Sequence, residues 1–145
     1  MALSLTDRII AAGQASGDPI LLELGWSQRA TALYHSGEVM AAESAFTKVH
    51  SFVCSNATRS RSMGIDVPLV ALALWPMSLL QLGEVAAAEQ QLAEVVRLFE
   101  CCMHLPTLCC AFAQLACETL PFFDNHDDVL LVSPRSLPRP RSLIS

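Results

Sequence analysis

The chain has 145 residues, of which 52% are hydrophobic and 16% are charged. A composition this apolar excludes a wholly disordered chain, and the length suits one domain with its own core. The formal net charge is −5, and three of the nine basic residues (Arg135, Arg139 and Arg141) lie near the C-terminus. The rest of the chain has six basic and fourteen acidic residues, and so acidic a segment is expected to repel phosphates. This argues against nucleic acid as a partner of the part of the chain that precedes these three arginines.

The first ten residues, MALSLTDRII, lack the basic region and the uninterrupted apolar segment of a secretory signal. The longest apolar run, residues 67–80, is shorter than the roughly 20 residues that a membrane-spanning helix needs. The sequence therefore predicts a cytoplasmic protein without membrane contact, whose six cysteines are reduced thiols.

The first predicted helix covers residues 3–16, with Ser4 or Thr6 as its N-cap. The next helix begins with Asp18 as N-cap and with Pro19 at the first helical position, where the missing N–H costs nothing.

A helical hairpin is predicted around Gly37, which ends the helix that begins at Pro19. Its second helix covers about residues 38–52. Apolar residues recur in that helix at spacings of 3 and 4, which places them in one stripe: Val39, Ala42, Phe46, Val49 and Val53.

Residues 67–103 predict a second hairpin, with a sharp turn at Gly83. Pro76 lies inside its first helix, where it removes a backbone hydrogen bond to Leu72 and is expected to kink the helix. The second helix again carries an apolar stripe, formed by Val85, Ala88, Leu92, Val95, Phe99 and Cys102.

Adding 46 to a residue number maps the first hairpin onto the second, which indicates an internal repeat. The corresponding pairs are Gly37 and Gly83, Glu38 and Glu84, Val39 and Val85, Ala42 and Ala88, Phe46 and Leu92, Val49 and Val95, and Val53 and Phe99. The pattern resembles the tetratricopeptide repeat, whose signature spacings match Trp26, Ala30, Leu33, Gly37, Ala42 and Phe46, and then Leu72, Leu79, Gly83, Ala88 and Leu92. It departs from that repeat at Arg29-Ala30, where Leu-Gly is usual, and in its period of 46 rather than about 34.

A longer resemblance covers roughly residues 15–130. Several short motifs follow one another in an order similar to that of the helical-repeat region of large bacterial signalling ATPases. They are GDP-x-LL, LYHSGEV-x-AA, an Arg-containing linker, GID, a Leu/Trp-rich helix, LGE-x-x-x-A and HLP-x-L. That family includes adenylate/guanylate cyclase, kinase and transcriptional-regulator types, and the resemblance implies a tetratricopeptide-like array in bacterial signalling. The sequence contains no G-x-x-x-x-G-K-[ST] loop and no cyclase domain, so the resemblance implies no nucleotide chemistry.

A third, incomplete hairpin is predicted after Met103. Its first helix is capped by Thr107 and runs to about residue 119, and a short helix at 127–132 follows a turn. The fold class is thus all-α, about two and a half tetratricopeptide-like hairpins behind an N-terminal helix, with residues 1–132 as the repeat domain. Residues 133–145 are rich in Pro, Ser and Arg and are predicted to be a disordered tail.

The cysteine-rich stretch invites a zinc hypothesis, because Cys101, Cys102, His104, Cys109, Cys110 and Cys117 lie close in sequence. Zinc ligands prefer spacings such as C-x-x-C, whereas adjacent helical cysteines point about 100° apart. Since cysteine also packs well between helices, we interpret these residues as structural and predict no metal ligands.

Other polar and aromatic residues have ordinary structural explanations. Nucleophilic catalysis needs a base held against the nucleophile, and none of His35, His50, His104 and His126 has such an arrangement locally. Asp127-Asp128 suits a helix start, Trp26, Trp75 and Met77 suit a core, and Arg59 and Arg61 suit a solvated linker. The sequence therefore predicts no enzyme, no catalytic residues and no cofactor.

We interpret the chain as a protein–protein interaction module of the tetratricopeptide type, in bacterial signal transduction or transcriptional regulation. A small-molecule or metal-sensing helical module and an inactive fragment of a larger signalling ATPase remain as alternatives. The incomplete third unit predicts a protein partner or self-association that covers Phe122 and Phe123.

Overall fold

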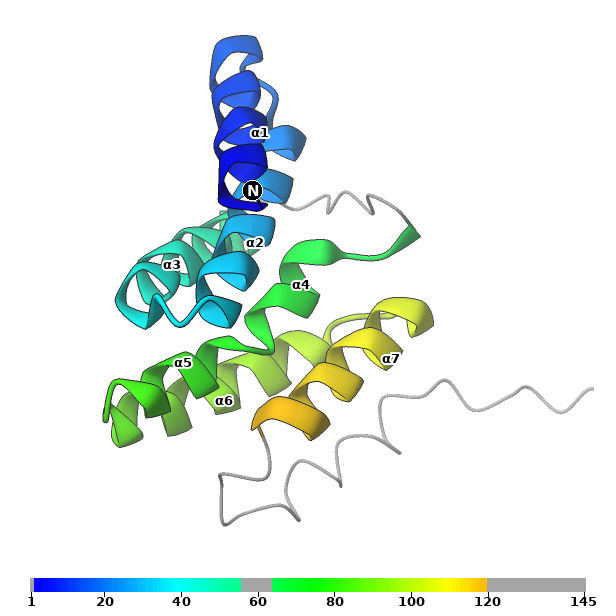
Figure 1. Cartoon of the computed structure of the whole chain (residues 1–145). Coiled ribbons are helices and arrows are strands. Elements are labelled where there is room, and N and C mark those ends of the chain that lie inside the picture. Colours follow the sequence, from blue (N-terminus) through cyan, green and yellow to red (C-terminus); the bar gives the residue numbers. More distant parts are fainter. Residues whose placement is uncertain (1, 56–63, 120–145) are drawn as a thin grey trace, which may run out of the picture.

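The computed structural model describes residues 2–55 and 64–119, and within them the regular structure is entirely helical (Figure 1). The all-α prediction is thereby confirmed. The elements are α1 (Ala2–Ser16), α2 (Pro19–His35), α3 (Val39–Ser55), α4 (Val67–Leu72), α5 (Trp75–Gln81), α6 (Val85–Glu100), α7 (Leu105–Gln114) and a π-helical turn, η2 (Leu115–Thr119). None of these helices combines the length and the apolar character that crossing a membrane requires.

The helices α1 and α2 pack closely against each other, because α2 presents a glycine where the two approach. A Cβ added at Gly25 would lie 2.7 Å from the side chain of Ile10, so a larger residue would push the helices apart. An ion pair between Asp7 and Arg29 also joins them. The predicted N-cap of α1 is wrong: Thr6 lies inside the helix and donates its hydroxyl to the carbonyl of Leu3 (2.8 Å). The start of α2 is as predicted, since the Asp18 carboxylate accepts from the Ile20 N–H at 2.9 Å.

The same helix-ending turn occurs twice, 46 residues apart. Gly37 and Gly83 have φ angles of +81° and +82°, which favour glycine because it has no side chain to clash. In each turn two N–H groups bond back to the last helical carbonyls, which is the Schellman arrangement. The matching pairs are Gly37 N–Tyr34 O (3.0 Å) and Gly83 N–Leu80 O (2.9 Å), then Glu38 N–Leu33 O (3.0 Å) and Glu84 N–Leu79 O (3.0 Å). The same turn thus joins α2 to α3 and α5 to α6.

The helix before the second turn is broken rather than kinked, which corrects the prediction at Pro76. The helix α4 ends at Leu72, and α5 restarts at Trp75. Pro76 has no N–H to donate to the Leu72 carbonyl, and its ring crowds that carbonyl. The intervening Ala73 and Leu74 donate instead to carbonyls three residues back, at 3.2 and 3.1 Å. The break lets α4 pack against α2, α3 and α7 at the centre of the molecule (Figure 1).

A single apolar core lies between these helices. Most of both predicted stripes is buried, including Phe46, Val49, Val95 and Phe99. Val39 and Leu92 are half-buried, and Val85, at the first position of α6, is 55% exposed.

The start of α7 is fixed by a buried polar network that the sequence did not reveal. His104, not Thr107, is the N-cap: its Nδ1 accepts from the Thr107 N–H at 3.4 Å. The Thr107 hydroxyl lies 2.8 Å from the same nitrogen and accepts from the Asp66 N–H at 2.8 Å. The first turns of α4 and α7 are thereby joined. The predicted turn and short helix beyond residue 119, the tail, and Phe122 and Phe123 lie outside the described residues.

Candidate functional site

The cysteine-rich stretch neither converges on one point nor fills the core. Cys102 alone of its five cysteines is buried, whereas Cys101, Cys109, Cys110 and Cys117 are exposed. The interpretation of these four as packing residues is therefore wrong. The apolar contacts are made by neighbours such as Leu108, Ala111 and Leu115. Cys109, Cys110 and Cys117 fall on the outward side of α7 and η2, and Cys101 lies at the end of α6.

The two tryptophans considered as core residues differ in burial. Trp75 is buried in the core, as predicted. Trp26 is half-buried and lies beneath the Lys48 ammonium, whose nitrogen is 4.0 Å from the ring centroid. Arg59, Arg61, His126 and Asp127-Asp128 lie outside the described residues.

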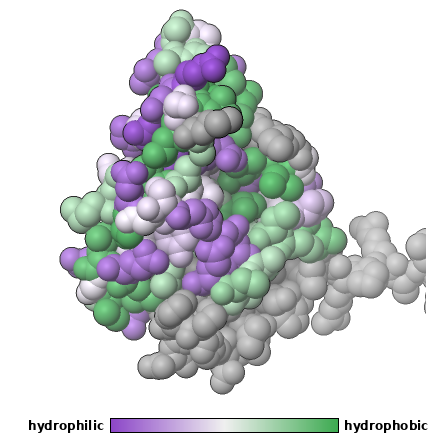
Figure 2. Space-filling model, viewed as in Figure 1, coloured by the Kyte–Doolittle hydropathy of each residue, from purple (hydrophilic) through white to green (hydrophobic). Residues whose placement is uncertain are grey.

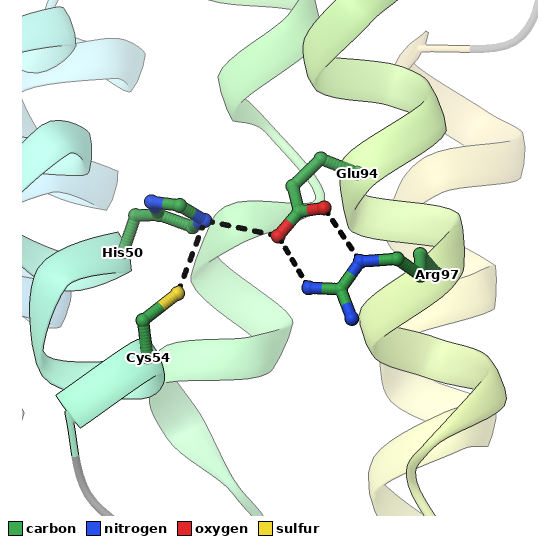
Figure 3. A network of polar contacts seen from close by, with 4 residues as sticks. All are labelled: His50, Cys54, Glu94 and Arg97. Atoms are coloured by element: carbon green, nitrogen blue, oxygen red, sulfur yellow. Dashed lines mark hydrogen bonds and ion pairs between the residues drawn. The ribbon is translucent and has the colours of Figure 1, made fainter.

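A cluster of three side chains that could bind a metal ion lies between α3 and α6 (Figure 3). His50 and Cys54 are four residues apart on α3, so both project from one face of the helix. Glu94 projects toward them from α6. The His50 Nε2 atom lies 3.4 Å from the Cys54 sulfur and 3.2 Å from Glu94 Oε1. All three potential ligand atoms lie within 4.8 Å of one another.

Arg97 fixes the carboxylate of this cluster. It is three residues after Glu94 on α6 and donates twice to it, from Nε to Oε2 and from its terminal nitrogen to Oε1, both at 2.7 Å. These hydrogen bonds from Arg97 are the main cause that lowers the pKa of Glu94 to about 2, and the contact with His50 acts in the same direction. The carboxylate is therefore ionised at neutral pH and turned with Oε1 toward the His50 ring.

The cluster is partly open to solvent. The side chains of His50 and Glu94 are 28% and 26% exposed, and Cys54 is exposed. The imidazole rests against the buried Trp75 ring, with centroids 5.3 Å apart and planes inclined by 52°. The ring orientation is thus set by the core, while its Nε2 edge faces the cysteine and the carboxylate.

Sequence reasoning missed this cluster. His50 received no role because its partners were sought nearby along the chain and because the helix was predicted to end at about residue 52, before Cys54. The structure continues α3 to Ser55, which places Cys54 one turn after His50. Glu94 lies 44 residues from His50, and the pairing of α3 with α6 depends on how the two hairpins meet. Only the three-dimensional structure supplies that relation.

Comparisons with protein-family models, with curated proteins and with solved structures find no match to this chain. The chemistry of the cluster is accordingly derived from its own geometry. It offers one imidazole nitrogen, one thiol sulfur and one carboxylate oxygen within reach of a single point, a set suited to binding a cation.

Proposed function

We propose that the chain is a non-catalytic protein–protein interaction module of the tetratricopeptide type, working in the cytoplasm of a bacterium in signal transduction or transcriptional regulation. The repeated Schellman turns and the antiparallel helix pairs support a repeat array. The order of short motifs resembles that of the helical region of large signalling ATPases, and this resemblance supports the signalling context.

The observation that carries an interaction role is the outward face of α7. This helix contains no charged residue. Its exposed positions recur along one side and are apolar or weakly polar: Leu105, Pro106, Cys109, Cys110 and Ala113. An uncharged helix face that remains exposed is typical of a surface that another protein covers.

A second copy of the chain is the partner that this face fits. In a two-fold symmetric dimer each patch meets itself, so a patch without charges meets no like charge. The small side chains of Cys109, Cys110 and Ala113 also allow two helices to approach closely. Outside the grey atoms, the face seen in Figure 2 mixes hydrophilic and hydrophobic residues.

Light scattering of the reduced full-length protein over a range of concentrations tests this proposal. We expect a monomer–dimer equilibrium and a dissociation constant raised at least about tenfold by Ala113→Asp, because the substitution puts two carboxylates opposite each other. Ala93→Asp is the matched control, since Ala93 is an exposed alanine on a different helix, α6. A monomer at every concentration, or an equal effect of both substitutions, would contradict the proposal.

A further inference from the structure

We infer that His50, Cys54 and Glu94 form a binding site for a single divalent transition-metal ion of the zinc class, placed at the seam between the two hairpins. This inference does not depend on the proposed interaction role, because it concerns α3 and α6 and not the outward face of α7.

Two of the three distances between the ligand atoms match those of a tetrahedral site, and the Cys54 sulfur lies within 4.8 Å of a Glu94 carboxylate oxygen. Zinc takes nitrogen and oxygen ligands at about 2.0–2.1 Å and sulfur at about 2.3 Å. Tetrahedral angles then place the nitrogen about 3.6 Å from the sulfur and about 3.3 Å from the oxygen. The observed separations from His50 Nε2, 3.4 Å to Cys54 Sγ and 3.2 Å to Glu94 Oε1, agree with these values within about 0.2 Å, the tolerance expected of a metal site.

Hydrogen bonding and metal binding use this arrangement differently. The Nε2 atom has one in-plane position, occupied either by a proton or by a lone pair. A proton donated to Glu94 leaves the exposed Cys54 sulfur to the solvent, and a lone pair that accepts from the thiol also faces the carboxylate charge. An ion at the centre satisfies the nitrogen, the sulfur and the oxygen together.

The donors also select the class of ion. One thiolate, one imidazole and one carboxylate form a mixed set that suits zinc, cobalt or nickel rather than magnesium or calcium, which prefer oxygen. Two negative ligands balance the charge of a divalent ion. Three protein ligands leave a fourth tetrahedral position open to water or to another ligand.

The surrounding residues hold the ligands in place. The His50 and Cys54 side chains share one helix face, and the Trp75 ring supports the imidazole from behind. Arg97 can keep its Nε bond to Glu94 Oε2 while Oε1 binds the ion, as outer hydrogen bonds commonly orient metal ligands. Because Cys54 is exposed, the ion has a direct path from solvent.

Titration of the reduced full-length protein with Co²⁺ under anaerobic conditions tests the site. We expect one cobalt ion per chain, with a sulfur-to-cobalt charge-transfer band in the near ultraviolet and the intense visible bands of tetrahedral cobalt, both removed by added Zn²⁺. Cys54→Ser should abolish the charge-transfer band. His50→Gln and Glu94→Gln should each weaken binding more than about 100-fold, since even outer residues cost 10–100-fold.

Cys101→Ser is the matched control, because Cys101 is also an exposed cysteine at a helix end and should leave the spectrum unchanged. The far-ultraviolet circular dichroism of each variant without metal verifies its fold. Absence of a charge-transfer band, its persistence in Cys54→Ser, or an unchanged affinity in Glu94→Gln would each overturn the three-ligand site.

Discussion

The two helix pairs α2–α3 and α5–α6 share a turn but differ in the helix that leads into it. In the first, α2 is one continuous helix of 17 residues. In the second, the equivalent segment is divided into α4 and α5. Subtracting 46 places Pro76 at Ala30, a fully buried residue in the middle of α2. The copy with proline at this position has a broken helix, and the copy with alanine has a continuous one. The turn and the second helix are present in both.

The difference shows that the repeat is not equally strict along its length. The turn depends on a glycine with positive φ, which both copies have. The helix before the turn can be interrupted if both of its segments pack against other helices, as α4 packs against α2, α3 and α7. The cluster of His50, Cys54 and Glu94 is also unrepeated, because Lys48 stands where the second copy has Glu94.

The largest expected effect comes from making the first copy like the second. Ala30→Pro should destabilise the protein by about 3 kcal/mol or more, because it removes a backbone hydrogen bond in α2 and inserts a ring where no space exists. Urea unfolding followed by circular dichroism measures the loss. A cost below about 1 kcal/mol would show that α2 tolerates the break as α4–α5 does.

A second comparison uses the equivalent core positions Phe46 and Leu92. Phe46 is completely buried, so Phe46→Ala should cost about 3–5 kcal/mol. Leu92 is only half-buried. Leu92→Ala should therefore lower the free energy of unfolding by less than about 2 kcal/mol, the lower end of the range for fully buried leucines. Equal losses in urea unfolding would mean that the two second helices are packed alike, contrary to the structure.

Loss of the N-cap of α2 should have a smaller effect. Asp18→Ala removes the hydrogen bond to the Ile20 N–H and should cost about 1 kcal/mol. Asp18→Asn keeps an acceptor at the same place and should restore most of the stability. If the two variants unfold at the same urea concentration, the cap contributes nothing.

The smallest expected effect concerns acid stability and is confined to the second copy, since Lys48 in the first has no carboxylate. Glu94 has a folded-state pKa of about 2, below its ordinary value of about 4.3. Its contribution is therefore fully present above about pH 4.3 and is lost as the pH falls toward 2. In metal-free protein, Glu94→Gln should flatten the pH dependence of stability within this window. An unchanged slope would contradict the lowered pKa.

The sequence was sufficient for the all-α class, the two turns and most of the buried stripes, because these follow from local spacing and from glycine. It overestimated the burial of the exposed cysteines, since helical periodicity gives the relative direction of side chains but not which face meets a neighbour. It also placed Pro76 in a kinked helix, because local rules give the lost hydrogen bond but not the contacts that stabilise a full break.

The candidate site was the least predictable feature. The His50–Cys54 pair requires α3 to continue past its predicted end at about residue 52, and the third member of the cluster lies 44 residues from His50. The distance between α3 and α6 depends on how α4 and α5 pack against both of these helices, which no local pattern encodes.

The free energies of unfolding of Gly37→Ala and Gly83→Ala test most directly that one hairpin occurs twice. Both glycines have positive φ, and an added Cβ at either would meet nothing within 4 Å, so the cost is that of the backbone alone. Each substitution should destabilise the protein by about 1 kcal/mol, and the two costs should agree within about 0.5 kcal/mol. A stabilisation by about 0.5–1 kcal/mol in either variant would place that glycine inside a continuous helix and contradict the repeated turn.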